Sequence, residues 1–311
     1  MWMSVGKTSS SSFFTFSSVA FLTIAVVLIS IFAMWFGGKS STMPLGSVTH
    51  EARCFVPVPR EEREAFIQAL WAKLRSEEGA RREGVSIKTG HMPTHFSSRT
   101  DSFINLSMDD VGIKFRHGSD LELKARTNRP SHDPDRPNLP EVWNKAELPF
   151  REEGGGGDIE TANRSSFFRS LHSSVSKLSA FEQKATVLER LTELSNIADR
   201  RVAEDVFDLE KSVSKMSAKI NDPDRPSDPF KVSFEVSFVS CPRLGSHFVT
   251  FNIEKAAIKR PSLVLSALQH LVDLSLSVTS NTTINDVIWG GYPHFVSQIA
   301  SNPSSSSSSS S

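Results

Sequence analysis

Residues 111–126, VGIKFRHGSDLELKAR, constrain the fold more than any other stretch, because apolar and charged side chains alternate along them. A period of two is typical of β-strands with one buried face. The turn residues HGSD at 117–120 divide the stretch and indicate a hairpin. The polar face of this predicted hairpin carries Lys114, Arg116, Glu122, Lys124 and Arg126.

A face of this composition suits a polyphosphate. Lysine and arginine supply charge-assisted hydrogen-bond donors, and a carboxylate can recruit a hard cation. A single hairpin has the same pattern when its polar face lies in water, which is common in antiparallel sheets. Further strands of the same kind are therefore needed before the pattern favours a binding site.

The balance of charge argues against a general nucleic-acid binder. The 311 residues include 35 basic and 35 acidic side chains, and the sequence pI is near 7.1. Cys54 and Cys241 lie far apart, so the chain has no disulfide framework and no cysteine pair of the metal-binding type, which leaves open only one bridge between the two. The nine histidines show no spacing that predicts a zinc site.

The uncharged run SSVAFLTIAVVLISIFAMWF at residues 17–36 has the length of a membrane-spanning helix. A cleaved signal peptide is the alternative, but its apolar region is usually about 7 to 15 residues long and ends at a small-residue cleavage site. The longer run favours an uncleaved anchor. Lys7 and Lys39 flank it on either side, so the orientation stays undetermined. The sequence therefore predicts a single-pass membrane protein of unknown compartment.

The composition divides the rest of the chain into segments. We predict a disordered N-terminus at 1–16, the transmembrane helix at 17–36, a linker at 37–48, a folded domain at 49–300 with polar insertions near 127–140 and 151–164, and a disordered serine-rich tail at 301–311.

Within the folded domain, hydrophobic periodicity predicts both strands and helices. Propensity does not decide between helix and strand at 206–219, and we predict a strand there. The other expected strands are 49–55, 141–150, 230–239 and 247–255, with a weaker one at 95–106. The expected helices are 60–82, 165–201 and 260–278, and the last ordered piece is 284–299.

These strands share an apolar face opposite a face with charges of both signs. The predicted fold class is α+β, an antiparallel β-barrel enclosing a tunnel, with peripheral helices over the apolar faces. Burying many charges is costly unless they pair with one another or with a ligand, and a polyanion with a divalent cation would meet that need. The expected lining is Lys114, Arg116, Lys124, Lys145, Lys211, Lys215, Glu51, Glu122, Glu147, Glu235 and Glu254.

A colinear series of motifs resembles the CYTH or triphosphate tunnel metalloenzyme superfamily, which includes thiamine triphosphatases, inorganic triphosphatases and class IV adenylate cyclases. The resemblance covers residues 49 to 300, and no single motif is specific. The motifs are HEARCF at 50–55, VGIKFR at 111–116, LELKAR at 121–126, WNKAEL at 143–148, LEKSVSK at 209–215 and SFEVSF at 233–238.

The resemblance implies Mg²⁺ or Mn²⁺ as cofactor and a triphosphate or other organophosphate as ligand. By position in the motifs, the metal ligands are expected to be Glu51, Glu122 and Glu235. The phosphate-binding residues are expected to be Lys114, Arg116, Lys124, Lys145, Lys211 and Lys215.

The chain departs from the family pattern at both acidic strands. Arg53 replaces the second carboxylate of the opening motif, Phe55 stands where the family has lysine, and Ser237 replaces the partner of Glu235. The basic half is better preserved, so phosphate binding carries over more safely than hydrolysis, and no catalytic residue is assigned.

Three functions follow from these patterns. The first is a membrane-anchored CYTH-like domain that binds, or also hydrolyses, a triphosphate-bearing compound with a divalent metal. The second is an inactive CYTH-like domain that binds phosphate or serves as a scaffold. The third sets the resemblance aside and is a single-pass membrane protein with a protein-interaction domain, whose partner the sequence does not identify.

Overall fold

The computed structural model describes residues 46–76, 81–82, 85–89, 95–116, 120–128, 132–133, 136–137, 139–149, 163–197, 199–222, 225–254, 257 and 259–301. The predicted N-terminal segment, most of the linker, most of the insertion near 151–164 and the serine-rich tail beyond residue 301 lie outside these residues. No helix in the described part of the chain is long and apolar enough to cross a membrane. The prediction of a single-pass membrane protein is corrected accordingly, and its segment 17–36 lies outside the described residues.

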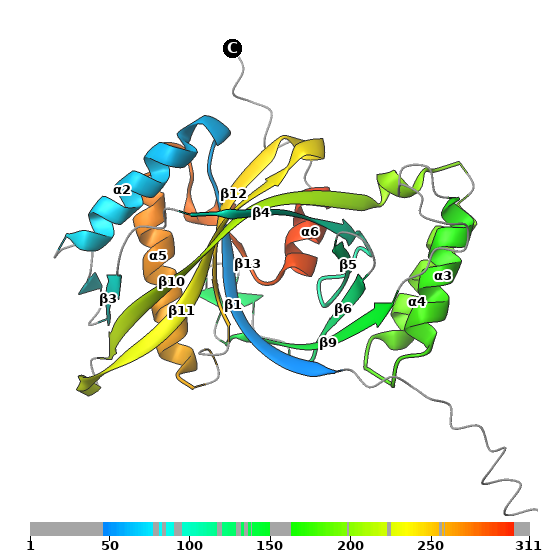
Figure 1. Cartoon of the computed structure of the whole chain (residues 1–311), viewed down its shortest axis with the longest axis horizontal. Helices are drawn as coiled ribbons and strands as arrows, with labels where there is room; N and C mark the ends of the chain where they lie inside the picture. Colours follow the sequence, from blue (N-terminus) through cyan, green and yellow to red (C-terminus); the bar gives the residue numbers. More distant parts are fainter. Residues whose placement is uncertain are drawn as a thin grey trace, which may run out of the picture. The chain divides into compact units, whose positions relative to one another are not determined.

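One antiparallel sheet dominates the described chain (Figure 1). Eight of its strands form a closed ring. Each strand pairs with the next one in the ring, and the eighth pairs with the first. In ring order they are β1 (Ser47–Pro57), β9 (Glu141–Pro149), β6 (Asp120–Arg126), β5 (Val111–Arg116), β4 (Ser97–Ile104), β10 (Val206–Asp222), β11 (Arg225–Cys241) and β12 (Ser246–Ile253).

Short strands extend this ring at two places. The far end of β10 pairs with β3 (Val85–Thr89), which pairs with β2 (Arg81–Arg82), and β1 also pairs with β13 (Ile288–Trp289). A separate pair joins β7 (His132–Asp133) to β8 (Arg136–Pro137) in the predicted polar insertion. The hairpin predicted at 111–126 is confirmed by the pairing of β5 with β6.

The predicted fold class, an antiparallel barrel preceded by a transmembrane helix, is wrong. The fold is mixed α/β, with an antiparallel sheet ring in place of the expected barrel. β10 and β11 have 17 residues each, and β10 pairs with β4 along its first part but with β3 near its end. In β10, every second side chain up to Val213 points to the inside of the ring. The next residues on that face of the strand are exposed, namely Lys215, Ser217 and Lys219. The two long strands thus run on past the ring.

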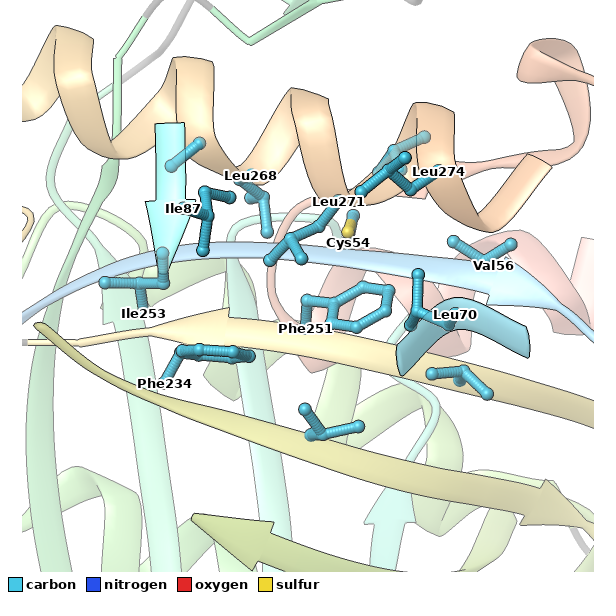
Figure 2. Packing of buried hydrophobic residues seen from close by; sticks show 14 of the residues in the cluster. Cys54, Val56, Leu70, Ile87, Phe234, Phe251, Ile253, Leu268, Leu271 and Leu274 are labelled. Atoms are coloured by element: carbon cyan, nitrogen blue, oxygen red, sulfur yellow. The ribbon is translucent and has the colours of Figure 1, made fainter. Parts of the chain in front are cut away.

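Helices α2 (Arg63–Arg75) and α5 (Pro261–Leu276) cover the outer side of β1, β10, β11 and β12. A single turn, η1 (Arg60–Glu62), precedes α2. Figure 2 shows side chains from both helices meeting those of the strands, among them Leu70, Leu268, Cys54, Val56 and Phe251. The helix predicted at 60–82 ends at Arg75, and residues 81–82 form β2 instead.

Helices α3 (Arg164–Ser176) and α4 (Lys184–Asn196) cover the outer side of β5 and β6. They form the helical region predicted at 165–201, which breaks between residues 176 and 184. The apolar positions of the central hairpin, including Ile113, Leu121 and Leu123, are fully buried against them. The single turns η2 (Val202–Glu204), η3 (Pro242–Leu244) and η5 (Ile284–Asp286) connect other elements.

Helix α6 (Tyr292–Ser301) packs on the opposite, inner side of the ring. Its Tyr292 and Phe295 join a buried cluster with Phe55 of β1 and Phe103 of β4, and the Phe55 and Phe295 rings stack at 4.0 Å. The close approach of α6 to β5 requires glycine at position 112, because a Cβ there would lie 2.5 Å from the Cγ of Pro293. Aromatic side chains thereby fill one end of the inner side.

Both cysteines are buried and free. Cys54 belongs to the cluster under α2 and α5, whereas Cys241 belongs to the cluster around α6. The bridge that the sequence left open is therefore not formed.

Candidate functional site

The charged side chains gather on the inner face of the ring, which we call the interior. In β1, alternation directs Ala52, Cys54 and Val56 toward the outer helices, so Glu51 and Arg53 face the interior. The same alternation operates in every ring strand. It places Asp101, Lys114, Glu122, Lys124, Glu141, Lys145, Lys211, Glu235 and Asn252 on this face.

Salt bridges between different strands show that these side chains converge. Lys124 Nζ of β6 donates to Glu51 Oε1 of β1 at 2.5 Å, across the intervening strand β9. Lys114 Nζ of β5 lies 2.9 Å from Glu122 Oε1 of β6. Both carboxylates are almost fully buried. Burial raises the pKa of Glu51, but the Lys124 and Arg53 cations outweigh it and hold that pKa at about 2.

Lys211 is the most deeply buried lysine in the described part of the chain. Its Nζ donates to Asp101 Oδ2 at 2.7 Å and lies 3.4 Å from the centre of the Tyr292 ring. Burial lowers the pKa of Lys211 well below its ordinary value, and the Asp101 carboxylate only partly opposes this. Asp101 itself is buried, yet the Lys211 cation lowers the pKa of its carboxyl group. This pair joins β10 to β4.

Lys124 and Lys145 lie directly opposite each other on β6 and β9. Like charges in opposite positions destabilise a sheet. Lys145 makes no salt bridge to any described residue, whereas Lys124 has Glu51. Partial burial and the charge of Lys124 lower the pKa of Lys145. The interior therefore holds a cation that makes no salt bridge to a described residue, although Glu122, Glu51 and Glu254 lie near enough to oppose the lowering of its pKa.

Arg53 lies at the centre of the acidic part of the interior. Its Nη2 is 3.7 Å from Glu51 Oε2 and 3.9 Å from Glu254 Oε1, and its guanidinium stacks on the Tyr292 ring at 4.3 Å. The neighbouring Asn252 is its register partner on β12. Among the described residues, Arg53 Nε and Nη1 have no hydrogen-bond partner, and neither has Asn252 Oδ1.

A hydrogen-bonded group borders the interior on β9. Arg126 Nη1 and Trp143 Nε1 donate to the two oxygens of Glu141, at 2.8 and 3.1 Å. Gly290 and Gly291 come close to this group, because a Cβ on either would lie 3.1 Å from a Glu141 oxygen. Trp143 is fully buried, and its hydrogen bond also fixes the orientation of this carboxylate.

The structure brings together most of the residues that the sequence predicted for the site. Four predicted phosphate-binding lysines and two predicted metal ligands face the interior, namely Lys114, Lys124, Lys145, Lys211, Glu51 and Glu122. Glu235 also faces it and accepts a hydrogen bond from Ser237 at 3.1 Å. Lys215, its partner in register, is exposed. The side chain of Arg116 lies outside the described residues.

Asp101 and Tyr292 are the residues that sequence reasoning missed. Asp101 lies in SSRTDSFI, a strand with few β-forming residues. The pattern that could have identified it is the placement of Arg99, Asp101 and Phe103 at every second position, on one face of the strand. The Tyr292 ring contacts both the Arg53 guanidinium and the Lys211 ammonium group. No pattern in the sequence around residue 292 predicts its contacts with β1 and β10.

The residues present do not fit a divalent metal as they stand. Among the described residues, no group of three or more histidine, cysteine, aspartate or glutamate side chains is placed to hold a metal ion. Lysines engage Glu51 and Glu122, and a guanidinium lies where Glu51 and Glu254 converge. The assignment of Glu51, Glu122 and Glu235 to Mg²⁺ or Mn²⁺ stays a prediction from the family resemblance.

A separate pocket of about 470 Å³ lies between the start of α2 and strands β4, β10, β11 and β12. Arg60, Arg63 and His247 contribute to its lining, and the Arg63 guanidinium stacks on Phe238 at 3.8 Å. Phe238 belongs to the cluster under the outer helices. The lining also includes Arg99 and Lys211, whose side chains belong to the interior face of the ring.

No protein-family model matches the sequence, and no curated protein matches it. One solved structure that is similar comes from Bacillus halodurans and is described as "a putative adenylate cyclase". The two chains are 10% identical, the match covers 75% of this chain and 91% of the other, and the TM-score is 0.31. At this identity and TM-score the comparison supports no statement about the fold or the function of this chain.

Proposed function

We propose that the interior binds a triphosphate-bearing compound or another organophosphate. The observation that supports this most directly is the opposed pair Lys124 and Lys145. A phosphate group between the two ammonium groups would replace their repulsion by two charge-assisted hydrogen bonds. Lys145 is the natural first contact, because it has no salt bridge to a described residue to give up.

Further cations lie close enough to extend the contact to a second phosphate group. Lys114 and Lys124 both lie near the Glu122 carboxylate. Burial alone would raise the pKa of Glu122, but the two lysines lower it below its ordinary value. A polyphosphate would compete with Glu51 and Glu122 for these ammonium groups. Each phosphate group that displaces a carboxylate from a lysine gains little by itself. A ligand with several phosphate groups makes several such replacements and is therefore favoured over a single phosphate ion.

Binding is better supported than hydrolysis. Hydrolysis in the family that the motifs resemble uses paired carboxylates to hold a divalent metal, and here Glu51 and Glu122 form ion pairs with lysines instead. We therefore place a binding role without turnover ahead of a phosphohydrolase, and a metal-dependent hydrolase is the second candidate.

The test is the affinity of the purified full-length chain for tripolyphosphate by titration calorimetry. Lys145→Met should weaken binding by roughly tenfold or more, because a charged hydrogen bond is worth about 1.5–3 kcal/mol. Lys219→Met is the matched control, since Lys219 is exposed on the part of β10 beyond the ring. Equal losses in both variants, or no binding by the wild-type chain, would refute the proposal.

A further inference from the structure

We infer that Arg53 acts as a built-in cation in the position that a divalent metal would otherwise take, so that the interior binds phosphate without a metal ion. This inference rests on the proposed function for its phosphate part only. Its electrostatic part is testable without any phosphate ligand.

The position of Arg53 is the first observation. A row runs across three neighbouring strands of the interior face, from Glu235 on β11 through Asn252 on β12 to Arg53 on β1. Glu51 and Glu254 approach the same guanidinium from β1 and from the end of β12. Carboxylate and amide oxygens are the ligands that hard divalent cations prefer. The Arg53 guanidinium lies between two such groups, with Nη2 3.7 Å from Glu51 Oε2 and 3.9 Å from Glu254 Oε1.

The charge balance is the second observation. Burial alone would lower the pKa of Arg53, but Glu51 and the other acidic groups, Glu235 and Glu254 among them, raise it. The side chain is only 4% exposed. A buried arginine stays charged and needs anionic partners to offset the loss of water. The acidic groups thus already have a cation, and a divalent ion would have to overcome its repulsion.

The remaining hydrogen-bonding capacity of Arg53 is the third observation. Nη2 faces the carboxylates, and the Tyr292 ring fixes the plane of the guanidinium. Nε and Nη1 have no hydrogen-bond partner among the described residues, although both atoms are buried. Buried donors without partners are rare and call for an explanation. An arginine with two donors to spare can donate charge-assisted hydrogen bonds to phosphate oxygens.

Together these observations give Arg53 both functions of a bridging metal. It neutralises the carboxylates on one side and offers positive charge and donors to a phosphate on the other. Arg53→Gln should remove this charge while keeping a polar side chain of similar reach. The acidic groups would then be free to attract a divalent ion, which the wild-type chain excludes.

The experiment has two arms, both with the full-length chain. In the first, Mn²⁺ alone is titrated into wild-type and Arg53→Gln protein and bound ion is measured by electron paramagnetic resonance. We expect no binding by the wild type and one bound ion in the variant. In the second, tripolyphosphate is titrated by calorimetry in EDTA. We expect the wild type to bind, Arg53→Gln to bind roughly tenfold or more weakly, and Arg53→Lys to fall between them.

The outcomes are distinct. Mn²⁺ bound by the wild type and lost in Glu51→Gln, or tripolyphosphate bound only when Mg²⁺ or Mn²⁺ is present, would overturn the inference. Failure of Arg53→Gln to bind Mn²⁺ while folded, as judged by circular dichroism, would overturn it too. If no condition gives tripolyphosphate binding, the proposed function fails and the Mn²⁺ arm still decides the role of Arg53. Should Arg53→Gln not fold, the wild-type measurements in both arms decide it.

Discussion

Replacing Glu51 by glutamine tests whether the interior charges are coupled as the structure indicates. The carboxylate of Glu51 is 1% exposed and is the salt-bridge partner of both Lys124 and Arg53. Glutamine keeps the shape of the side chain but removes the charge. The two cations would then remain in a buried environment without their shared partner, so we expect Glu51→Gln to lower the free energy of unfolding.

The size of the effect follows from the pKa of Glu51, which falls from 4.5 to about 2 in the folded protein. That fall corresponds to roughly 3 kcal/mol of stability, which agrees with the 3–5 kcal/mol that breaking a buried ion pair usually costs. Because the folded-state pKa is lowered, this contribution is fully present above pH 4.5 and is lost as the pH falls toward 2. It should decline to about half by about pH 3.

The assay is urea denaturation of the wild-type and Glu51→Gln proteins at several values between about pH 7 and about pH 3. The difference in free energy of unfolding should be about 3 kcal/mol near neutrality and should shrink as the solution becomes acidic. Glu193→Gln, an exposed carboxylate on α4 that pairs with Arg190, is the control, and it should change stability by less than about 0.5 kcal/mol. A Glu51→Gln difference that stays constant with pH, or that matches the control at neutrality, would refute the reasoning.

Two further predictions concern the packing around the interior. Lys211→Met should cost about 3–5 kcal/mol by urea denaturation, because the buried Asp101 loses its closest cation and keeps only the more distant and more exposed Arg99. The double variant Lys211→Met/Asp101→Asn should recover part of that loss, and an additive double variant would contradict a direct pair. Gly112→Ala should cost about 1–3 kcal/mol, because the new Cβ would overlap Pro293 and force α6 away from β5. A melting temperature equal to that of the wild type would show that α6 does not pack so closely.

The alternation of side chains was enough to predict most of the interior. It placed Lys114, Lys124 and Glu122 on one face of the central hairpin, and the register of β5 and β6 confirms this arrangement. Strand pairing keeps the period of two whatever the global shape of the sheet. A local pattern can therefore predict which residues share a face of a strand, but it does not predict what that face surrounds in the folded protein.

The parts that failed depend on contacts between distant segments. Lys215 continues the pattern of Lys211 by sequence, but it is exposed because β10 has by then passed the ring. The prediction of a barrel was wrong for the same reason. No local pattern in the sequence shows that β10 and β11 extend beyond the ring. Asp101 acquires its role only from Lys211, which lies more than a hundred residues further along the chain.

The way in which the ring closes also bears on how the chain folds. β1 is the first described strand, and its partners β9, β12 and β13 all come much later in the sequence, with Ala52 opposite Ile253. Pairings over such long separations slow folding, because the entropy of closing the loop is lost before the contact forms. During synthesis one edge of β1 waits for β9 at residues 141–149 and the other for β12 at 246–253, and until then these edges are unpaired and open to other chains.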